Sequence, residues 1–313
     1  MPSAQPSLQP PLPPLRGPEP QTFAGPSRVA RWASFVKLPH TVFALPFALV
    51  GVLLASFAHP VDARLVGWVI VAFTAARFAA MAFNRIVDRD VDAANPRTAM
   101  RELPSGALGV REAKVSVAVA SAVFVVAAAL LNPLCLALSP VALACVLFYS
   151  YCKRFTRWSH LVLGLGLGIA PVGGYLAVTG AWSRPWWLIC ALSLAVTAWV
   201  GGFDVFYSLQ DESFDRAHGL HSLPVAMGET GAIGTARALH AFAVAMLAAV
   251  AAGAPGGNAW IAVGVVVVAA LLLWEHRLVR PGDLSRLDAA FFTMNGIISL
   301  AFLGCVLAAR LLA

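Results

Sequence analysis

The chain has 313 residues, of which 59% are hydrophobic and 12% are charged, and its formal net charge at pH 7 is +7. A soluble domain is about 45–50% apolar and about 25% charged, so this composition excludes an ordinary soluble protein and predicts an integral membrane protein. The basic excess does not indicate a nucleic-acid-binding surface, because Lys and Arg are scattered among the connections between apolar segments.

The N-terminal part of the chain differs from the rest. Residues 1–26 are rich in Pro, Gln and Ser and lack apolar periodicity, which predicts a disordered tail without the apolar core of a secretory signal. Residues 27–38 mix basic and apolar side chains and predict a short amphipathic helix at the membrane surface. We expect the remainder, with this surface helix, to form a single intramembrane domain over 27–313.

Long apolar runs separated by turn residues predict an all-α membrane protein. A span needs about 20 mostly apolar residues. The sequence predicts a bundle of nine transmembrane helices, at residues 39–57, 65–87, 112–131, 134–152, 159–180, 186–208, 230–252, 258–275 and 288–309.

The distribution of basic residues predicts the orientation of this bundle. Of the 22 Lys and Arg residues, 17 fall in the tail or in connections on the N-terminal side of the membrane, and three fall on the opposite side. The positive-inside rule therefore places the N-terminus in the cytoplasm and the C-terminus outside. It follows that the second, fourth and sixth spans all end at the cytoplasmic face.

The second predicted span ends in an array of polar and acidic residues. Asn84, Asp88 and Asp92 are spaced by four, so they share one face if the helix continues. By itself this array also fits a solvated helix end with a charged loop. Acidic groups at the end of a membrane span are nevertheless costly, which indicates a functional role.

The sixth predicted span ends in a second array. Asp204, Asp211 and Asp215 are spaced by seven and four and again share one helix face, at the same leaflet as the first array. Carboxylates gathered in one cavity repel one another, so positive charge is expected among them. Oxygen-only ligands favour a hard cation such as Mg²⁺. For the nearby His218 and His221, a role in the loop is favoured over metal binding.

Basic residues supply candidate anion-binding groups. Lys153 and Arg154 end the fourth span, and Tyr149 lies one turn before Lys153. The two basic residues fit a membrane anchor or an anion-binding site, and the acidic arrays on the same side favour the latter. Arg77 lies two turns deeper than Asn84; it either pairs with a carboxylate or binds an anionic group of a substrate.

Together these motifs resemble the UbiA superfamily of intramembrane prenyltransferases, over residues 27 to the C-terminus. The N-x-x-x-D-x-x-x-D motif is met by the first array, and the following R-T-x-x-R motif by Arg97, Thr98 and Arg101. The Y-x-x-x-K motif is met by Tyr149 and Lys153, and D-x6-D-x3-D by the second array. The chain departs from many members in having Arg85 after Asn84, and from some in having His221 where they have Lys.

The resemblance implies transfer of a polyprenyl group from its diphosphate to an aromatic acid, such as 4-hydroxybenzoate or a dihydroxynaphthoate, in ubiquinone or menaquinone biosynthesis. It implies a cytoplasm-facing central cavity in a multi-pass protein of a bacterial inner membrane, with lipid, polyprenyl diphosphate and aromatic acceptor as partners and no nucleic acid. A haem or chlorophyll-type acceptor is an alternative, and a transporter that uses intramembrane carboxylates is an alternative from another class.

The resemblance also implies roles for individual residues. The metal ligands for two Mg²⁺ ions would be Asn84, Asp88, Asp92, Asp211 and Asp215, and the four acids together with Lys153 would be catalytic. The diphosphate would contact Lys37, Arg97, Arg101, Tyr149, Lys153 and Arg154. The acceptor or the cavity wall would involve Arg77, Asp204 and His221.

Overall fold

A computed structural model describes residues 27–37, 41–255, 259–287 and 293–312. Across these residues the chain is helical, with no β-strand and one isolated bridge between Arg280 and Asp283. The predicted tail at 1–26 lies outside the described residues, as do the start of the first predicted span and the start of the last one.

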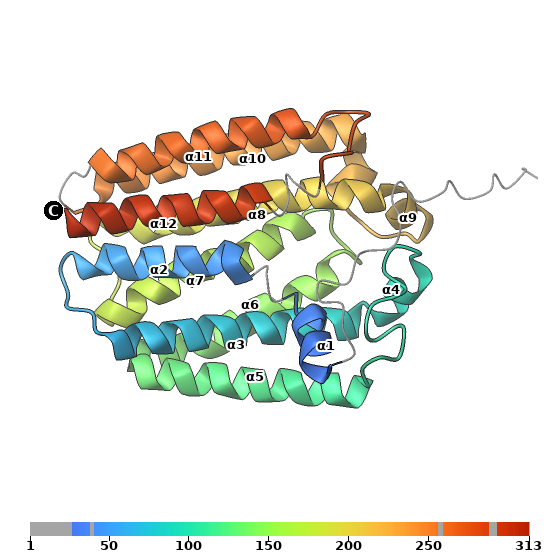
Figure 1. Ribbon diagram of the computed structural model, residues 1–313, viewed down its shortest axis with the longest axis horizontal. Helices are drawn as coiled ribbons and strands as arrows, with labels where there is room; N and C mark the ends of the chain where they lie inside the picture. Colours follow the sequence, from blue (N-terminus) through green and yellow to red (C-terminus); the bar gives the residue numbers. More distant parts are fainter. Residues whose placement is uncertain (1–26, 38–40, 256–258, 288–292, 313) are drawn as a thin grey trace, which may run out of the picture.

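The long helices run side by side in a bundle (Figure 1). In chain order the described helices are α1 (Arg28–Phe35), α2 (Thr41–Ser56), α3 (Ala63–Val87), α4 (Arg89–Ala94), α5 (Val110–Leu131), α6 (Pro133–Cys152), α7 (Ser159–Thr179), α8 (Trp187–Ser208), the 3-10 helix η2 (Leu209–Asp211), α9 (Glu212–Ala217), α10 (Leu223–Gly253), α11 (Ala259–Leu278) and α12 (Asn295–Leu311).

In the described part of the chain, seven helices are long and apolar enough to cross a membrane: α3, α5, α6, α7, α8 with its continuation to Ala217, α10 and α11. Two shorter apolar helices, Ala44–Ser56 within α2 and Asn295–Leu311, coincide with the first and last predicted spans. The all-helical membrane architecture is therefore confirmed, and the count of nine spans stays a prediction.

The largest difference in a described boundary is at α10, which begins at Leu223 rather than at residue 230. The Ser222 side chain caps its first turn by accepting a hydrogen bond from the backbone N–H of Val225 at 3.4 Å. Gly228 then interrupts the helix with a φ of 68°, a left-handed conformation that a glycine adopts without steric cost. The apolar run after this kink is the segment that the sequence predicted.

Helix α8 lies at the centre of the bundle and is almost continuously buried between α7 and α10. Its Trp199 packs against Phe47 of α2 with ring centroids 5.0 Å apart, and Phe47 also stacks on Phe302 of α12. Close approach of α7 to α8 depends on glycine, because a Cβ at Gly164 would overlap the backbone of Thr197. Dense packing of α8 fixes the position of the acidic residues at its end.

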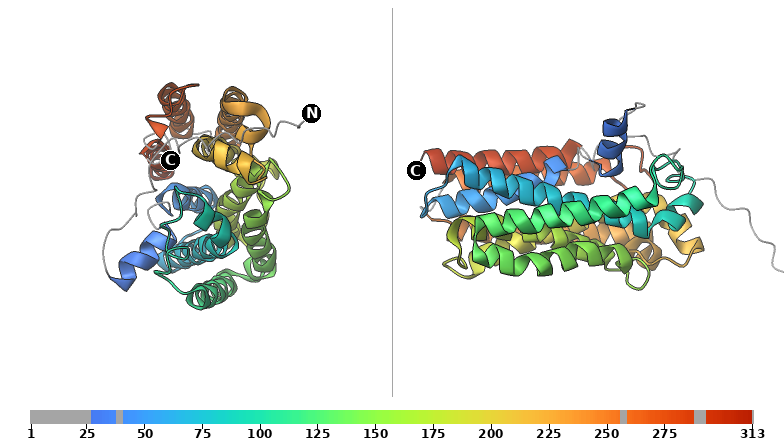
Figure 2. Two further views of the ribbon diagram at one scale, coloured as in Figure 1. Left: turned by 90° about the vertical axis from the view of Figure 1, so that its right-hand side faces the viewer. Right: turned by 90° about the horizontal axis from the view of Figure 1, so that it is seen from below.

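The helix α1 lies beside the bundle and crosses the direction of the long helices (Figures 1 and 2). Its Trp32 stacks on Phe78 of α3 at a centroid distance of 6.1 Å, and Arg28 forms an exposed ion pair with Glu112 of α5. At the same end of the bundle lie α4 and α9, whereas the C-terminal end of α12 lies at the opposite end (Figure 1). The two acidic arrays therefore meet at one end.

Candidate active site

A polar cavity of about 220 Å³ opens at the end of the bundle that carries α4 and α9. Thirteen of the predicted site residues line it: Lys37, Arg77, Asn84, Asp88, Asp92, Arg97, Arg101, Tyr149, Lys153, Arg154, Asp204, Asp211 and Asp215. The remaining predicted residue, His221, is exposed and is not part of this lining. Its backbone N–H donates to the carbonyl oxygen of Lys153 at 2.7 Å, which gives the loop a structural contact with the end of α6.

The first array is positioned by a break between two helices. Asp88 ends α3 and precedes α4 with φ −92° and ψ 5°, so the continuous helix expected from the spacing is interrupted there. The Asn84 amide nevertheless donates to Asp88 Oδ2 at 2.8 Å across one turn. Asp92 lies on α4 and is 6% exposed. The second array is divided similarly, because η2 interrupts the path from α8 to α9.

Each of four carboxylates in the cavity lies beside a basic side chain from a different segment. The N–O distances are 3.1 Å for Asp88–Arg154, 2.6 Å for Asp92–Arg101, 2.6 Å for Asp211–Arg97 and 3.8 Å for Asp215–Lys153. The positive charge expected among the acids is thus supplied partly by the protein. Four of the basic residues predicted to bind an anion hold these carboxylates: Arg97, Arg101, Lys153 and Arg154.

Charge and burial act in opposite directions on these groups. Burial raises the pKa of Asp88, as does the neighbouring Asp92, and these effects outweigh the opposite effects of Arg154 and Lys153. For Lys153, burial lowers the pKa, but the surrounding carboxylates, Asp215 first, more than compensate and leave it above the ordinary value. Lys153 therefore remains a cation in this cavity.

The donor set fits a hard divalent cation that shares its coordination with a substrate. Asp92 Oδ2 and Asp215 Oδ2 are buried and accept no hydrogen bond from the part of the chain that the structure describes, so each array presents an oxygen that could bind a cation. Within the described ranges, no three His, Cys, Asp or Glu side chains are grouped closely enough to hold a metal. Mg²⁺ commonly takes one or two carboxylates together with phosphate oxygens, which matches two separate acidic arrays.

Some contacts in and around the cavity involve residues that the sequence analysis did not select, namely Tyr207, Asn95 and His160. The phenol oxygen of Tyr207 accepts hydrogen bonds from Lys37 Nζ at 3.3 Å and from Arg97 Nη1 at 3.1 Å. The Asn95 amide donates to Asp211 Oδ1 at 3.1 Å, and His160 Nδ1 lies 2.7 Å from Asp204 Oδ2. Tyr207 lies three residues after Asp204 and four before Asp211, so its helical spacing was the available signal.

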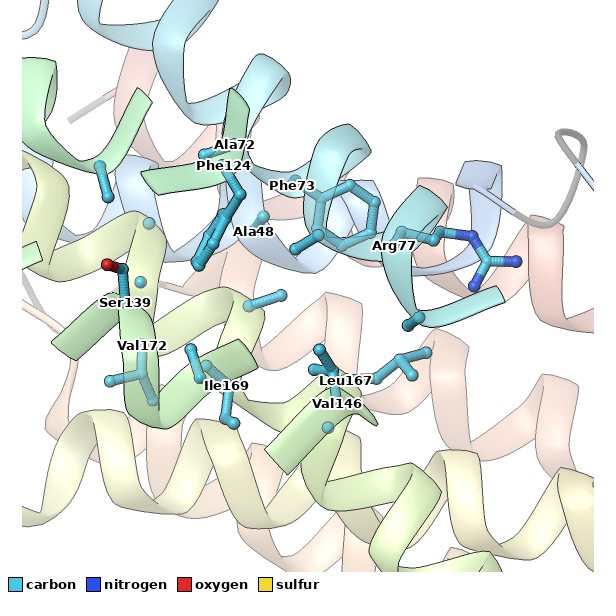
Figure 3. Close-up of a pocket in the computed structure, with 18 of the residues that line it drawn as sticks. Ala48, Ala72, Phe73, Arg77, Phe124, Ser139, Val146, Leu167, Ile169 and Val172 are labelled. Carbon is cyan, nitrogen blue, oxygen red and sulfur yellow. The ribbon is translucent and has the colours of Figure 1, made fainter. Parts of the chain in front are cut away.

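An apolar cavity of about 190 Å³ continues from the polar one between α2, α3, α5, α6 and α7. The two cavities share Arg77, Met81, Tyr149, Leu163 and Leu167 in their linings. Arg77 lies at one end of the drawn lining and Ser139 toward the other, with Phe73 and Phe124 between them (Figure 3). This arrangement joins a charged compartment to an apolar one.

Arg77 lies at the junction of the two cavities with its charge uncompensated by an ion pair among the described residues. Its Nε is buried and has no hydrogen-bond partner there. Of the two alternatives raised by the sequence, pairing with a protein carboxylate is thus not seen in the described part of the chain. Binding of an anionic substrate group is the alternative that this geometry favours.

Residues 44–297 match the model of the UbiA prenyltransferase family. The 4-hydroxybenzoate octaprenyltransferase of Aromatoleum aromaticum is 31% identical over 231 residues, which are 74% of this chain and 77% of the relative. The enzyme of the same name from Alkalilimnicola ehrlichii is 31% identical over 233 residues, with the same shares of the two chains.

Solved structures give the same result for the fold. The apo structure of a UbiA homolog from Aeropyrum pernix K1 is 36% identical and covers 86% of this chain and 97% of its own, with a TM-score of 0.78. A UbiA homolog from Archaeoglobus fulgidus, solved bound to GPP and Mg²⁺, is 20% identical with a TM-score of 0.68, covering 90% of this chain and 99% of its own.

Proposed function

The chain belongs to the UbiA prenyltransferase family, and we propose that this membrane prenyltransferase moves a polyprenyl group from its diphosphate to an aromatic acid. The reaction would require Mg²⁺ and release diphosphate. The acceptor would be 4-hydroxybenzoate or a related quinone precursor such as a dihydroxynaphthoate. The names of the relatives support 4-hydroxybenzoate, and the solved homologue with GPP and Mg²⁺ supports use of an allylic diphosphate with a divalent metal.

The observation that carries this proposal is the junction of a charged cavity with an apolar one. A polyprenyl diphosphate has the same division, with an anionic head and an apolar chain. The head would lie among the acidic and basic side chains at the end of the bundle, while the first part of the chain would enter the apolar cavity past Arg77 and Tyr149. The rest of a long chain would extend into lipid.

The proposed roles follow from the contacts. Asp88, Asp92, Asp211 and Asp215, with Asn84, would hold two Mg²⁺ ions, which supply charge neutralisation of the diphosphate when bound. The side chains that bind the phosphate oxygens would be Lys37, Arg97, Arg101, Tyr149, Lys153 and Arg154. By stabilising negative charge on the leaving diphosphate, these groups would allow the allylic C–O bond to break. The apolar walls would exclude water from the carbocation.

Arg77 is the group that we assign to the acceptor. Its buried guanidinium lies between the two cavities and pairs with no carboxylate in the described ranges, so the carboxylate of an aromatic acid would satisfy it. This contact would place the aromatic ring beside the first carbon of the prenyl chain.

For the topology, we propose nine spans with the N-terminus and the active site in the cytoplasm of a bacterial cell. The basic end of the bundle and the two shorter apolar helices support this arrangement. The clustering of the acids at one end argues against the transporter alternative, in which binding sites lie near the middle of the membrane.

The test is prenyl transfer by the purified protein in lipid nanodiscs. Polyprenyl diphosphates of several lengths would be combined with a panel of aromatic acids, and both the prenylated product and released diphosphate would be measured. We expect activity with Mg²⁺ and about a hundredfold or greater loss in Asp88→Asn and Asp211→Asn, since each removes a ligand charge.

A matched control is available two residues from Asp88. Asp90 belongs to the same segment, but its side chain is 86% exposed and pairs only with Arg89 in the described structure. Asp90→Asn should retain the activity of the unmodified protein. Full activity in the Asp88 and Asp211 variants, or absence of product with every aromatic acid, would contradict the proposed function.

A further inference from the structure

We propose that Asp204 is the general base that removes the ring proton of the aromatic acceptor, and that His160 is the positioning residue that holds Asp204 for this step. The inference rests on the proposed function, and it assigns the final proton transfer of that reaction to a pair of residues.

Asp204 is set apart by its partner. The carboxylates of Asp88, Asp92, Asp211 and Asp215 all lie beside Arg or Lys side chains. Asp204 instead contacts the imidazole of His160, at 2.7 Å between Oδ2 and Nδ1. A carboxylate held by a permanent cation is a poor proton acceptor, because the cation stabilises its charged form. A neutral hydrogen-bond donor orients a carboxylate without suppressing its basicity to the same extent.

The contacts of His160 define it as such a neutral donor. Its Nε2 accepts a hydrogen bond from the backbone N–H of Leu223 at 3.4 Å, so the lone pair is on Nε2 and the proton is on Nδ1. The side chain is 0% exposed. Nδ1–H therefore donates to Asp204. Because both ring nitrogens are engaged, the imidazole is held in one orientation.

Asp204 also lies in the right part of the cavity. It lines the polar cavity together with Arg77 and Tyr149, two of the residues shared with the apolar cavity, and its side chain remains 21% exposed. It precedes Asp211 by seven residues, which corresponds to about 10 Å along a helix. Asp204 therefore lies deeper than Asp211, toward the site where the ring and the allylic carbon would meet.

The chemistry requires a base at this position. When the allylic C–O bond breaks, its electron pair leaves with the diphosphate, and a ring carbon forms the new C–C bond with the allylic carbon. That ring carbon still bears hydrogen, and the ring has lost its aromaticity. Transfer of this proton to a carboxylate oxygen of Asp204 returns the C–H electron pair to the ring. Asp204 then releases the proton to water at the cavity opening, and His160 keeps its own proton throughout.

The test uses an acceptor deuterated at the ring positions that can be prenylated, with the full-length protein in nanodiscs. In the unmodified protein, loss of the ring proton should be fast, so the deuterium isotope effect on kcat should be close to 1. In Asp204→Asn we expect kcat to fall about 10²–10⁴-fold, the usual contribution of a general base. Proton loss should then limit the rate, with an isotope effect of about 2 or more.

His160→Leu removes the donor while keeping an apolar side chain of similar size. We expect kcat to fall about 10-fold to 100-fold, the isotope effect to rise above 1, and the KM for the prenyl diphosphate to change less than about twofold. This expected fall in kcat is the usual cost of removing a partner that orients a functional group. His160→Gln retains an N–H donor and should recover most of kcat and an isotope effect near 1.

His240 provides a matched control, because it is also a buried histidine on a helix packed against α8, but its ring nitrogens contact His276 and the carbonyl oxygen of Trp199 rather than Asp204. His240→Leu should leave the isotope effect near 1 even where the yield of folded protein falls. An isotope effect of 1 in both Asp204→Asn and His160→Leu would overturn the inference. It would also be overturned if His160→Gln were folded but no more active than His160→Leu. Those results leave prenyl transfer by the unmodified protein intact, whereas failure of the proposed function would remove that activity itself.

Discussion

The ion pair between Arg97 and Asp211 gives a quantitative test of how the loop after α4 is attached to the centre of the bundle. Two guanidinium nitrogens contact the two carboxylate oxygens, at 2.8 Å for Nε–Oδ1 and 2.6 Å for Nη2–Oδ2. The side chains are 8% and 10% exposed. Arg97→Ala leaves a buried carboxylate without its cation, which should destabilise the folded protein by about 3–5 kcal/mol.

A second substitution should reverse part of this loss. Adding Asp211→Asn to Arg97→Ala removes the uncompensated charge, so we expect the double variant to be about 1–3 kcal/mol more stable than Arg97→Ala alone. The control is the Arg89–Asp90 pair on α4, with a similar distance of 2.8 Å but side-chain exposures of 45% and 86%. Arg89→Ala should cost about 0–1 kcal/mol.

The assay is reversible unfolding in mixed micelles without Mg²⁺ or diphosphate, with the free energy of unfolding measured for each variant. The explanation from burial would be refuted if Arg97→Ala cost no more than Arg89→Ala. It would also be refuted if Asp211→Asn gave no recovery in the Arg97→Ala background.

Three further predictions concern helix packing, the acceptor and the metal. Gly168→Ala should destabilise the bundle by about 1–3 kcal/mol, because its Cβ would overlap Thr197 Oγ1 and lie 2.7 Å from a backbone oxygen of α8. Gly173→Ala should be tolerated, since no atom of the described structure lies within 4 Å of its Cβ. Thermal unfolding in detergent distinguishes the two variants. Arg77→Met should raise the KM for the aromatic acid about 10-fold to 100-fold, because a charge-assisted hydrogen bond is lost, with little change in the KM for the prenyl diphosphate. An unchanged KM for the aromatic acid would contradict the assignment of Arg77 to the acceptor. Titration calorimetry should show Mg²⁺ binding weakly alone and at least about tenfold more tightly with inorganic diphosphate present, and equal affinities would contradict shared coordination.

The features that could be predicted from the sequence are those that depend on local spacing. The helical period of 3.6 residues places Asn84, Asp88 and Asp92 on one face, and the alternation of spans places both acidic arrays at one end of the bundle. All but one of the selected residues line the polar cavity. His221 was the exception, because its selection rested on its position in a motif rather than on any helical register.

The contacts that escaped prediction are those between distant segments. Arg97 and Asp211 are 114 residues apart, and His160 and Asp204 are 44 residues apart. Their pairing depends on how α7 and the loop after α4 pack against α8, which spacing along one helix does not determine. His160 also had no local signal, since a single histidine at the start of an apolar helix is compatible with ordinary burial.

The pairing of acids with bases in the cavity has a consequence for the order of binding. A cation that approached alone would have to compete with Arg97, Arg101, Lys153 and Arg154 for the carboxylates, and each displaced base would then lie in a crowded cavity without a counter-charge. A diphosphate that arrived with the metal would change this balance, because its oxygens would pair with the same bases while the metal took the carboxylates. Contacts to the substrate complex would then replace the four internal ion pairs, so little charge would be left uncompensated. The proposed site would therefore favour binding of metal and diphosphate together, since binding of either one alone would be opposed by the ion pairs that the protein already contains.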